Sequence, residues 1–247
     1  MSVKTRIKLG VSGACGKMGT RILALAGSDL DFKVSLALDR PGHPQIGEKI
    51  SGIEVASDRA LLKTIDCLID FSSPEATLAN LEDCARFKKA IVIGTTGFSQ
   101  EQKQEIARRA KEIPVVFSPN MSIGVNLLFA LVKDAAAALP DDYKISIVEA
   151  HHVHKKDAPS GTAKFLAEII EDARGERPED IKSIREGEIV GDHDVIFESS
   201  VDTIVLRHHA KTRDIFVQGA LKAAKFIVTK KKGLFGMQDV LCKSSRH

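Results

Sequence analysis

Residues 149–165, EAHHVHKKDAPSGTAKF, concentrate side chains that can do chemistry. Three histidines, two lysines and an aspartate stand before a Pro-Ser-Gly sequence. Histidine and lysine side chains can transfer protons near neutral pH, and histidine can also bind metals. The segment could therefore form a metal site, a solvated loop or an acid/base centre.

A metal site fits the spacing poorly. His151 and His152 are adjacent, so on an extended chain they point to opposite faces. His152 and His154 could converge, but no cysteine or spaced carboxylate of the segment makes an obvious third ligand. The sequence therefore predicts no metal here.

The end of the segment predicts an anion site. Ser160 is placed to cap a helix, and Gly161 and Thr162 follow with backbone N–H groups at its positive end. A solvated loop would explain the polarity but not this helix start. A substrate carboxylate would fit between the helix start and the histidine and lysine side chains.

The first half of the chain alternates strand and helix patterns. Apolar or β-branched runs occur at 7–12, 33–39, 66–72, 90–96 and 114–118. Ser73-Pro74 and the Ser99/Gln102 pair predict helix starts between them. Such alternation indicates a parallel sheet covered on both faces, so residues 1–121 are interpreted as a doubly wound α/β domain.

The second half predicts a smaller α+β domain. A helix is expected over 124–139, a strand over 143–150, and a helix after Ser160 that Gly175 ends. Three further strand-like runs follow, at 182–189, 194–200 and 202–210. They favour a mixed or mostly antiparallel sheet, and residues 216–228 return to a helical period.

A glycine-rich loop follows the first strand. Its glycines, at 13, 16 and 19, would let the backbone turn and approach a pyrophosphate at the helix start. Asp39 lies 20 residues after Gly19 and could accept hydrogen bonds from an adenosine ribose. Arg40 could instead pair with a 2′-phosphate. A tight turn and a loop cap are the alternatives, but the combination favours dinucleotide binding.

Two further segments end strands where ligands bind in open α/β sheets. They are GTTGF, residues 94–98, and SPNMSIGVN, residues 118–126. Their hydroxyls and backbone would suit a nicotinamide ribose and carboxamide, although each could be a plain turn.

Composition predicts a cytoplasmic protein. The net charge of +3 is too small to favour nucleic-acid or membrane partners. The N-terminus has no apolar signal region, and the longest aliphatic run, 127–132, is too short to cross a bilayer. Four cysteines fall in no CxxC spacing, which is typical of free thiols in a reducing compartment.

The histidine segment closely resembles the dihydrodipicolinate reductase signature H-H-x-x-K-x-D-A-P-S-G-T-A. GACGKMG, VIGTTGF, SPNMSIGVN, EIVGDHDVIF and GLFGMQDVL are also similar to stretches of that family. The similarity covers nearly the whole chain. It implies NADH- or NADPH-dependent reduction of 4-hydroxy-tetrahydrodipicolinate in lysine and diaminopimelate biosynthesis.

The resemblance also implies an architecture and site residues. It implies a Rossmann-like domain (1–121), a substrate-binding and tetramerisation domain (122–213) and a C-terminal segment returning to the first domain (214–247). His151 would be the proton donor and acceptor and Lys155 a second proton donor, while His152, Gly161 and Thr162 would bind the dicarboxylate substrate. The dinucleotide would contact Gly13, Ala14, Cys15, Gly16, Lys17, Met18, Asp39, Arg40, Gly94, Thr95, Thr96, Ser118, Pro119, Asn120 and Met121.

The chain departs from the family pattern in three places. The linker around 176–183 is short, His209 stands where arginine or lysine is usual, and Asp39 replaces a frequent glutamate. The last change leaves both NADH and NADPH open as cofactors.

Two other functions remain possible from the sequence. One is another dehydrogenase of amino-acid metabolism; a semialdehyde enzyme would need a nucleophilic cysteine, and residues 122–241 contain none. The other is a regulator that senses a dinucleotide without catalysis.

Overall fold

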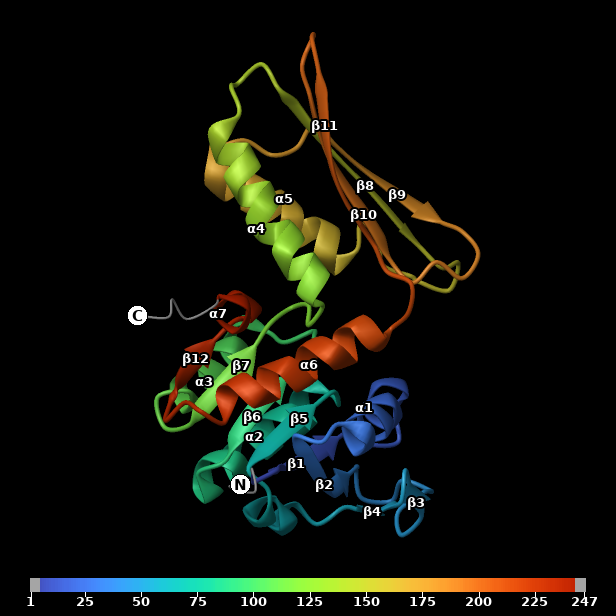
Figure 1. Ribbon diagram of the computed structural model, residues 1–247, viewed down its shortest axis with the longest axis vertical. Helices are drawn as coiled ribbons and strands as arrows, with labels where there is room; N and C mark the ends of the chain where they lie inside the picture. The colour runs from blue at the N-terminus through green and yellow to red at the C-terminus, as the bar shows by residue number, and fades with distance from the viewer. Residues whose placement is uncertain (1–4, 243–247) are drawn as a thin grey trace. The chain divides into compact units, whose positions relative to one another are not determined.

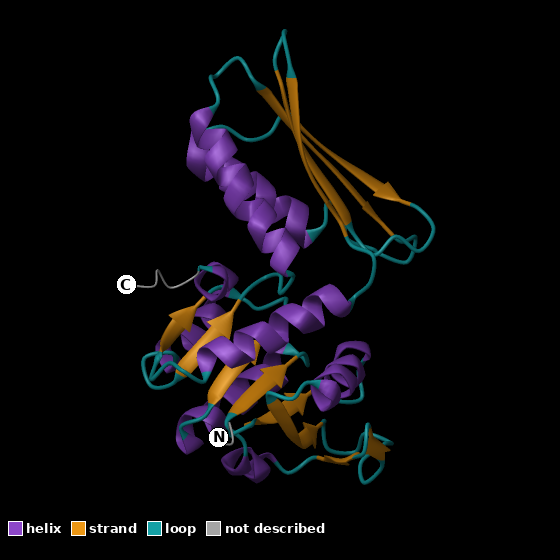
Figure 2. Ribbon diagram, viewed as in Figure 1, coloured by secondary structure: helices purple, strands orange, loops and turns teal. Residues whose placement is uncertain are grey.

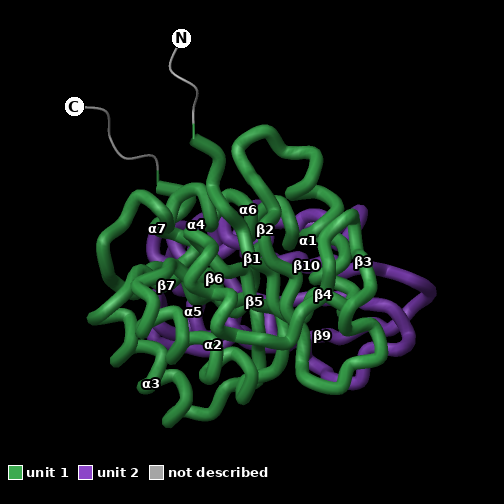
Figure 3. The backbone as a smooth tube through the Cα atoms, turned by 90° about the horizontal axis from the view of Figure 1, so that it is seen from below, with its two compact units in different colours: residues 1–121, 216–247 green, residues 122–215 purple. Residues whose placement is uncertain are grey.

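The computed structural model describes residues 5–242, and these form two compact units (Figure 3). Unit 1 runs to Met121 and resumes at Phe216, whereas unit 2 spans Ser122–Ile215. Unit 2 is therefore inserted between two parts of unit 1.

Unit 1 is built on an eight-stranded sheet (Figure 1). Its strands are β1 (Ile7–Ser12), β2 (Phe32–Leu38), β3 (Lys49–Ile50), β4 (Ile53–Ala56), β5 (Cys67–Asp70), β6 (Ala90–Ile93), β7 (Pro114–Phe117) and β12 (Gly233–Phe235). The order is β12-β7-β6-β5-β1-β2-β4-β3, and every pair is parallel except β3 with β4. The predicted doubly wound, Rossmann-like class is confirmed.

Helices separate the parallel strands of unit 1 (Figure 2). They are α1 (Lys17–Ser28), the 3₁₀ helix η1 (Arg59–Thr64), α2 (Pro74–Phe87), α3 (Gln100–Arg109), α6 (Asp214–Ile227) and α7 (Met237–Leu241). Both predicted helix starts are confirmed: the Ser73 side chain caps α2 with Pro74 behind it, and Ser99 and Gln102 form a capping box on α3. The core beside them is aliphatic, with Leu68, Leu81 and Ile91 fully buried.

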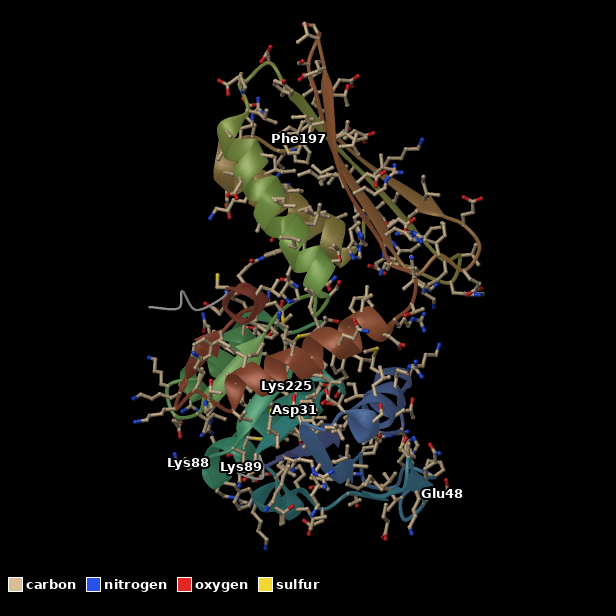
Figure 4. The ribbon with its side chains drawn as sticks, viewed as in Figure 1. Asp31, Glu48, Lys88, Lys89, Phe197 and Lys225 are labelled. Atoms are coloured by element: carbon tan, nitrogen blue, oxygen red, sulfur yellow. The ribbon has the colours of Figure 1, made fainter. Side chains whose placement is uncertain are left out.

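The C-terminal stretch completes unit 1. Helix α6 confirms the helical period expected over 216–228 and buries Val217, Ala220 and Ala224. Lys225 on this helix forms ion pairs of 2.8 Å with Asp29 and with Asp31. Lys225 and Asp31 are labelled in Figure 4. Strand β12 then adds to the sheet beside β7.

Unit 2 packs two helices on a four-stranded sheet. Its elements are α4 (Ile123–Ala138), β8 (Lys144–His151), α5 (Gly161–Arg174), β9 (Asp180–Arg185), β10 (Asp192–Glu198) and β11 (Thr203–His209). The order is β11-β10-β8-β9, with β8 and β9 parallel and the other pairs antiparallel, so the predicted mixed sheet is confirmed.

One face of this sheet carries the core of unit 2. Alternate residues of β8 and β10 point toward α4 and α5, which lie side by side along that face (Figure 1). Phe197 is the largest fully buried side chain (Figure 4). Phe129 and Phe165 meet edge to face between the helices, with ring centroids 4.9 Å apart.

The linker between α5 and β9 is short and covers only residues 175–179. Gly175 ends the helix in the left-handed conformation at φ +82°, as the sequence predicts. Arg177 returns to Glu171 of α5 at 2.7 Å, and β9 begins at Asp180. No helix among the described residues is long and apolar enough to span a membrane.

Candidate functional site

Strand β8 delivers the first residues of the histidine segment to one face of the unit 2 sheet. Its burial alternates, so Ile147, Glu149 and His151 share the face that packs against the helices. His152 follows the strand, and its backbone N–H is held by the carbonyl of Ile189 at 2.7 Å. The adjacent histidines thus lie in different surroundings: His151 is buried and His152 is half-buried.

Glu149 is the centre of a buried polar network and is fully shielded from solvent. Its Oε2 accepts hydrogen bonds from His151 Nδ1 at 2.5 Å and from Arg185 Nη1 at 3.0 Å. Its Oε1 accepts from Arg185 Nη2 at 2.8 Å and from the backbone N–H of Ser160 at 3.2 Å. Arg185 also donates to the carbonyl oxygen of Asp157. The guanidinium thus holds the carboxylate through both oxygens.

This network determines the charges at the site. Burial, the largest single influence, would raise the pKa of Glu149, but the hydrogen bonds that it accepts, led by those from Arg185, together outweigh burial and lower the pKa to about 2. Burial lowers the pKa of His151. The hydrogen bond and the charge of Glu149 raise this pKa, whereas the charges of Lys155 and Arg185 lower it further. Glu149 is therefore ionised at neutral pH, and His151 has a neutral resting form.

The start of α5 touches the same network. The Ser160 hydroxyl caps the helix by accepting from Ala163 N–H at 3.2 Å, as the sequence predicts. A Cβ atom at Gly161 would meet nothing within 4 Å, so the first helical residue leaves open space at the positive helix end. The acid/base candidate His151 and the candidate anion-binding helix start are thereby linked through Glu149.

Lys155 lies in the loop between β8 and α5. Its ammonium is 2.9 Å from Asp157 Oδ1, and this contact lowers the pKa of Asp157. The rings of His152 and His154 are 6.0 Å apart and tilted. The loop thus places the cationic side chain of Lys155 where its charge acts on His151.

The glycine-rich loop of unit 1 has the geometry that a pyrophosphate cradle needs. Gly13 adopts φ +73°, and a Cβ there would lie 2.4 Å from the carbonyl oxygen of Phe71. A Cβ on Gly19 would lie 2.0 Å from the carbonyl oxygen of Gly13. Gly16 is the N-cap of α1 and makes no side-chain capping hydrogen bond, which leaves backbone N–H groups at the helix start for a ligand. These observations fit a dinucleotide phosphate.

A cleft of about 860 Å³ opens beside this loop within unit 1. Asp39, directly after β2, lines it and accepts from Cys15 N at 2.9 Å and from Arg40 N at 2.8 Å. Arg40 lines the cleft and is exposed. The acidic and basic candidates for ribose recognition are thus neighbours at one wall.

Cys15, Asp39 and His43 also bring metal-type donor atoms within 4.8 Å of one another in the described chain. Burial, followed by the Asp39 contact, raises the pKa of the Cys15 thiol to about 11. The thiol is therefore protonated at neutral pH. Cys15, Asp39 and His43 all line the cleft.

The remaining cofactor candidates lie at other strand ends of unit 1. Gly94 must lack a side chain because a Cβ would lie 2.2 Å from the Phe71 ring. Thr95 is buried, and its hydroxyl bonds to Ser72 N and Thr77, so only its backbone remains for a ligand. The cleft is lined by Gly13, Cys15, Gly16, Asp39 and Arg40, but not by Ala14, Lys17, Met18, Gly94, Thr95, Thr96, Ser118, Pro119, Asn120 or Met121.

Sequence reasoning missed three residues of the unit 2 network: Glu149, Arg185 and His193. Glu149 could have been found, because strand alternation places it on the same face as His151. Arg185 lies opposite His151 only through the parallel β8–β9 register. His193 comes from β10, and its ring packs edge-on to His151 at 5.2 Å. His209, the departure noted from the sequence, pairs with Asp192 at 2.7 Å on an exposed surface.

Both halves of the chain match family models, over residues 7–121 for "Dihydrodipicolinate reductase, N-terminus" and 124–241 for "Dihydrodipicolinate reductase, C-terminus". The 4-hydroxy-tetrahydrodipicolinate reductase of Geotalea uraniireducens (strain Rf4) is 43% identical, across 95% of this chain and 98% of its own. The enzyme of that name from Nitrosomonas europaea is 41% identical, across 96% and 98%. A dipicolinate-bound dihydrodipicolinate reductase from Paenisporosarcina sp. TG-14 superposes with a TM-score of 0.82 at 24% identity, covering 96% of this chain and 100% of its own. This chain therefore belongs to the dihydrodipicolinate reductase family.

Proposed function

We propose that this protein reduces 4-hydroxy-tetrahydrodipicolinate to tetrahydrodipicolinate with NADH or NADPH, in lysine and diaminopimelate biosynthesis. The relatives that it matches along nearly their whole length carry the name of this reductase. The observation that carries the proposal is structural: a buried carboxylate joins a proton-transfer histidine to an open helix start. That arrangement suits an acidic substrate that must receive a proton.

Unit 1 would hold the dinucleotide, and the reduced nicotinamide supplies the hydride when bound. Gly13, Gly16 and Gly19 leave the backbone bare where a pyrophosphate would approach. Asp39 would accept hydrogen bonds from the adenosine ribose, and Arg40 would tolerate a 2′-phosphate. We infer that both cofactors are used, with some preference for NADH. Gly94–Thr96 and Ser118–Met121 would act through their backbone at the nicotinamide end.

Unit 2 would bind the substrate and handle the proton. Gly161 and Thr162 at the start of α5 would bind one carboxylate, and His152 would help to anchor the dicarboxylate. His151 would deliver the proton from Nε2, because its Nδ1 is held by Glu149. Lys155 would stabilise negative charge and serve as a second proton donor. The net reaction takes up one hydride and one proton and releases the C4 hydroxyl as water.

A spectrophotometric assay tests the proposal. NADH or NADPH oxidation is followed after adding freshly generated substrate from the preceding aldol condensation enzyme. Turnover that depends on the substrate supports the reductase. Dinucleotide binding without turnover would instead support a sensor, and turnover only with other amino or hydroxy acids would support a different dehydrogenase.

We also propose a homotetramer assembled through unit 2. The sheet face opposite α4 and α5 is covered by no element of unit 2, and edge strand β11 exposes Ile204 and Val205. Pairing with other copies would shield this edge from unwanted strand addition.

A further inference from the structure

We propose that Glu149, clamped by Arg185, is a positioning residue that fixes the orientation and tautomer of His151 while anchoring the start of α5. This inference rests on the proposed function of His151 in proton transfer. It goes beyond that function by assigning roles to a carboxylate and a guanidinium that touch neither substrate nor cofactor directly.

The hydrogen-bond pattern around Glu149 leaves no freedom for the His151 ring. Each carboxylate oxygen receives two donors, one of them from Arg185. An ionised carboxylate can only accept, so His151 Nδ1 must carry a hydrogen. The opposite ring atom, Nε2, is then the one that takes up and releases the catalytic proton.

The surroundings of Nε2 support this assignment. A Cβ atom on Gly191 would lie 3.1 Å from His151 Nε2. Any other residue at this position would place a side chain against the reacting nitrogen. The absence of a side chain at Gly191 thus keeps that atom approachable while Glu149 covers the far side of the ring.

Charged and titratable groups surround His151 from every adjoining element. Glu149 comes from β8, Arg185 from β9 and His193 from β10, and Lys155 approaches from the loop. Glu149 favours the imidazolium, whereas Arg185 and Lys155 disfavour it. Removal of Glu149 and removal of Arg185 should therefore move the His151 titration in opposite directions.

The same carboxylate also holds the helix start. Glu149 Oε1 accepts the Ser160 backbone N–H, directly before the first residue of α5. Loss of the carboxylate should consequently weaken substrate binding as well as proton transfer. A histidine held only by packing would show no such coupling.

The test is Glu149→Gln, observed by nitrogen NMR of protein with ¹⁵N-labelled histidine. A glutamine amide nitrogen would face an Arg185 donor at either oxygen position, so the clamp would be broken and the side chain would no longer be restricted to accepting from His151 Nδ1. We expect His151 in the natural protein to be the Nδ1–H tautomer, and the variant to show a mixture with a lower titration midpoint. In the reductase assay, kcat should fall on the order of 10²-fold and KM should rise.

Two companion variants separate positioning from general damage. Arg185→Gln should raise the His151 midpoint, opposite to Glu149→Gln, and Glu149→Asp should restore much of the Nδ1–H population. If Glu149→Gln does not fold, the direction of the Arg185→Gln shift decides the matter. An unchanged tautomer in folded Glu149→Gln, or a His151 midpoint that Arg185→Gln lowers or leaves unchanged, would overturn the proposal.

A matched control comes from an exposed glutamate–histidine pair. Glu188 lies 3.5 Å from His154 Nε2, and both side chains are largely exposed. Glu188→Gln should leave the His151 tautomer and kcat unchanged. Because the NMR measurement needs no turnover, a missing reductase activity in the natural protein would contradict the proposed function without touching the tautomer result.

Discussion

The hydroxyl of Ser160 lies 3.2 Å from Nε2 of His193, and both side chains are buried. The hydroxyl oxygen already accepts the Ala163 N–H, so its own proton is available for the imidazole. His193 is thereby held as a neutral acceptor beneath the start of α5. Burial lowers its pKa to about 3, so the native state does not take up a proton there at mildly acidic pH.

The first prediction is a pH-dependent stability that His193 causes. The unfolded chain binds a proton on this histidine near pH 6.5 and the folded chain does not, so stability is complete above that pH and declines toward pH 3. The slope should reach about 1.4 kcal/mol per pH unit. Urea unfolding of His193→Gln should show a shallower slope, and the exposed His154→Gln serves as control. The prediction would be contradicted if the free energy of unfolding changed with pH at the same slope in the natural protein, His193→Gln and His154→Gln.

The second prediction separates the two residues that we propose handle protons, His151 and Lys155. His151→Gln should lower kcat by about 10²–10⁴-fold with a modest change in substrate KM. Lys155→Ala should lower kcat and also raise KM, because it removes a permanent charge beside the anion site. Affinity for NADH, measured by titration, should barely move in either variant. A fall of about tenfold or more in both, with kcat preserved, would make this segment a cofactor element instead.

The third prediction concerns cofactor choice. Asp39→Ser removes the carboxylate that would accept ribose hydrogen bonds, so KM for NADH should rise more than KM for NADPH. Asp58→Ser is the matched control, because Asp58 lines the same cleft but caps η1, a role that serine retains. An equal rise for both cofactors in Asp39→Ser would refute the ribose assignment.

The fourth prediction compares two glycines of helix α1. Gly19→Ala would force a Cβ to within 2.0 Å of the Gly13 carbonyl oxygen, so the loop must shift and dinucleotide affinity should fall about tenfold or more. Gly27→Ala meets nothing within 4 Å and should raise stability by about 0.5–1 kcal/mol without affecting binding. Unaltered NADH binding in Gly19→Ala would refute the proposed pyrophosphate site at the glycine-rich loop.

The fifth prediction concerns assembly. Light scattering at micromolar concentration should give a tetramer mass, and Val205→Asp on edge strand β11 should reduce it. Leu30→Asp is the control, because Leu30 is an equally apolar and more exposed residue of unit 1. A monomer mass for the natural protein would refute the proposed tetramer.

Local signals explain which parts of the fold the sequence could predict. The cap at Ser73, the capping box at Ser99 and the left-handed Gly175 depend on a few neighbouring residues, and all three are confirmed. Strand β12 was not predicted, because a three-residue strand gains its stability from β7, more than a hundred residues earlier. Its place depends on the assembled sheet rather than on its own residues.

The same distinction applies to the site. The Ser160 cap and the different surroundings of His151 and His152 follow from short patterns in the chain. The Arg185 contact with Glu149 does not, because the two residues are 36 positions apart and meet only after α5 has crossed between β8 and β9. The register of parallel strands is fixed by that crossover, so sequence alternation alone cannot name the guanidinium's partner.

The insertion of unit 2 within unit 1 has a consequence for how the chain matures during synthesis. Translation releases the first part of unit 1, up to Met121, before unit 2, but α6 and β12, which complete unit 1, follow only after unit 2. Until then the surface that receives Val217, Ala220 and Ala224 stays uncovered, and the β7 edge stays unpaired. Unit 2 is continuous in sequence and can fold earlier, so the nascent chain should depend on chaperone protection of the first part of unit 1 until α6 and β12 emerge.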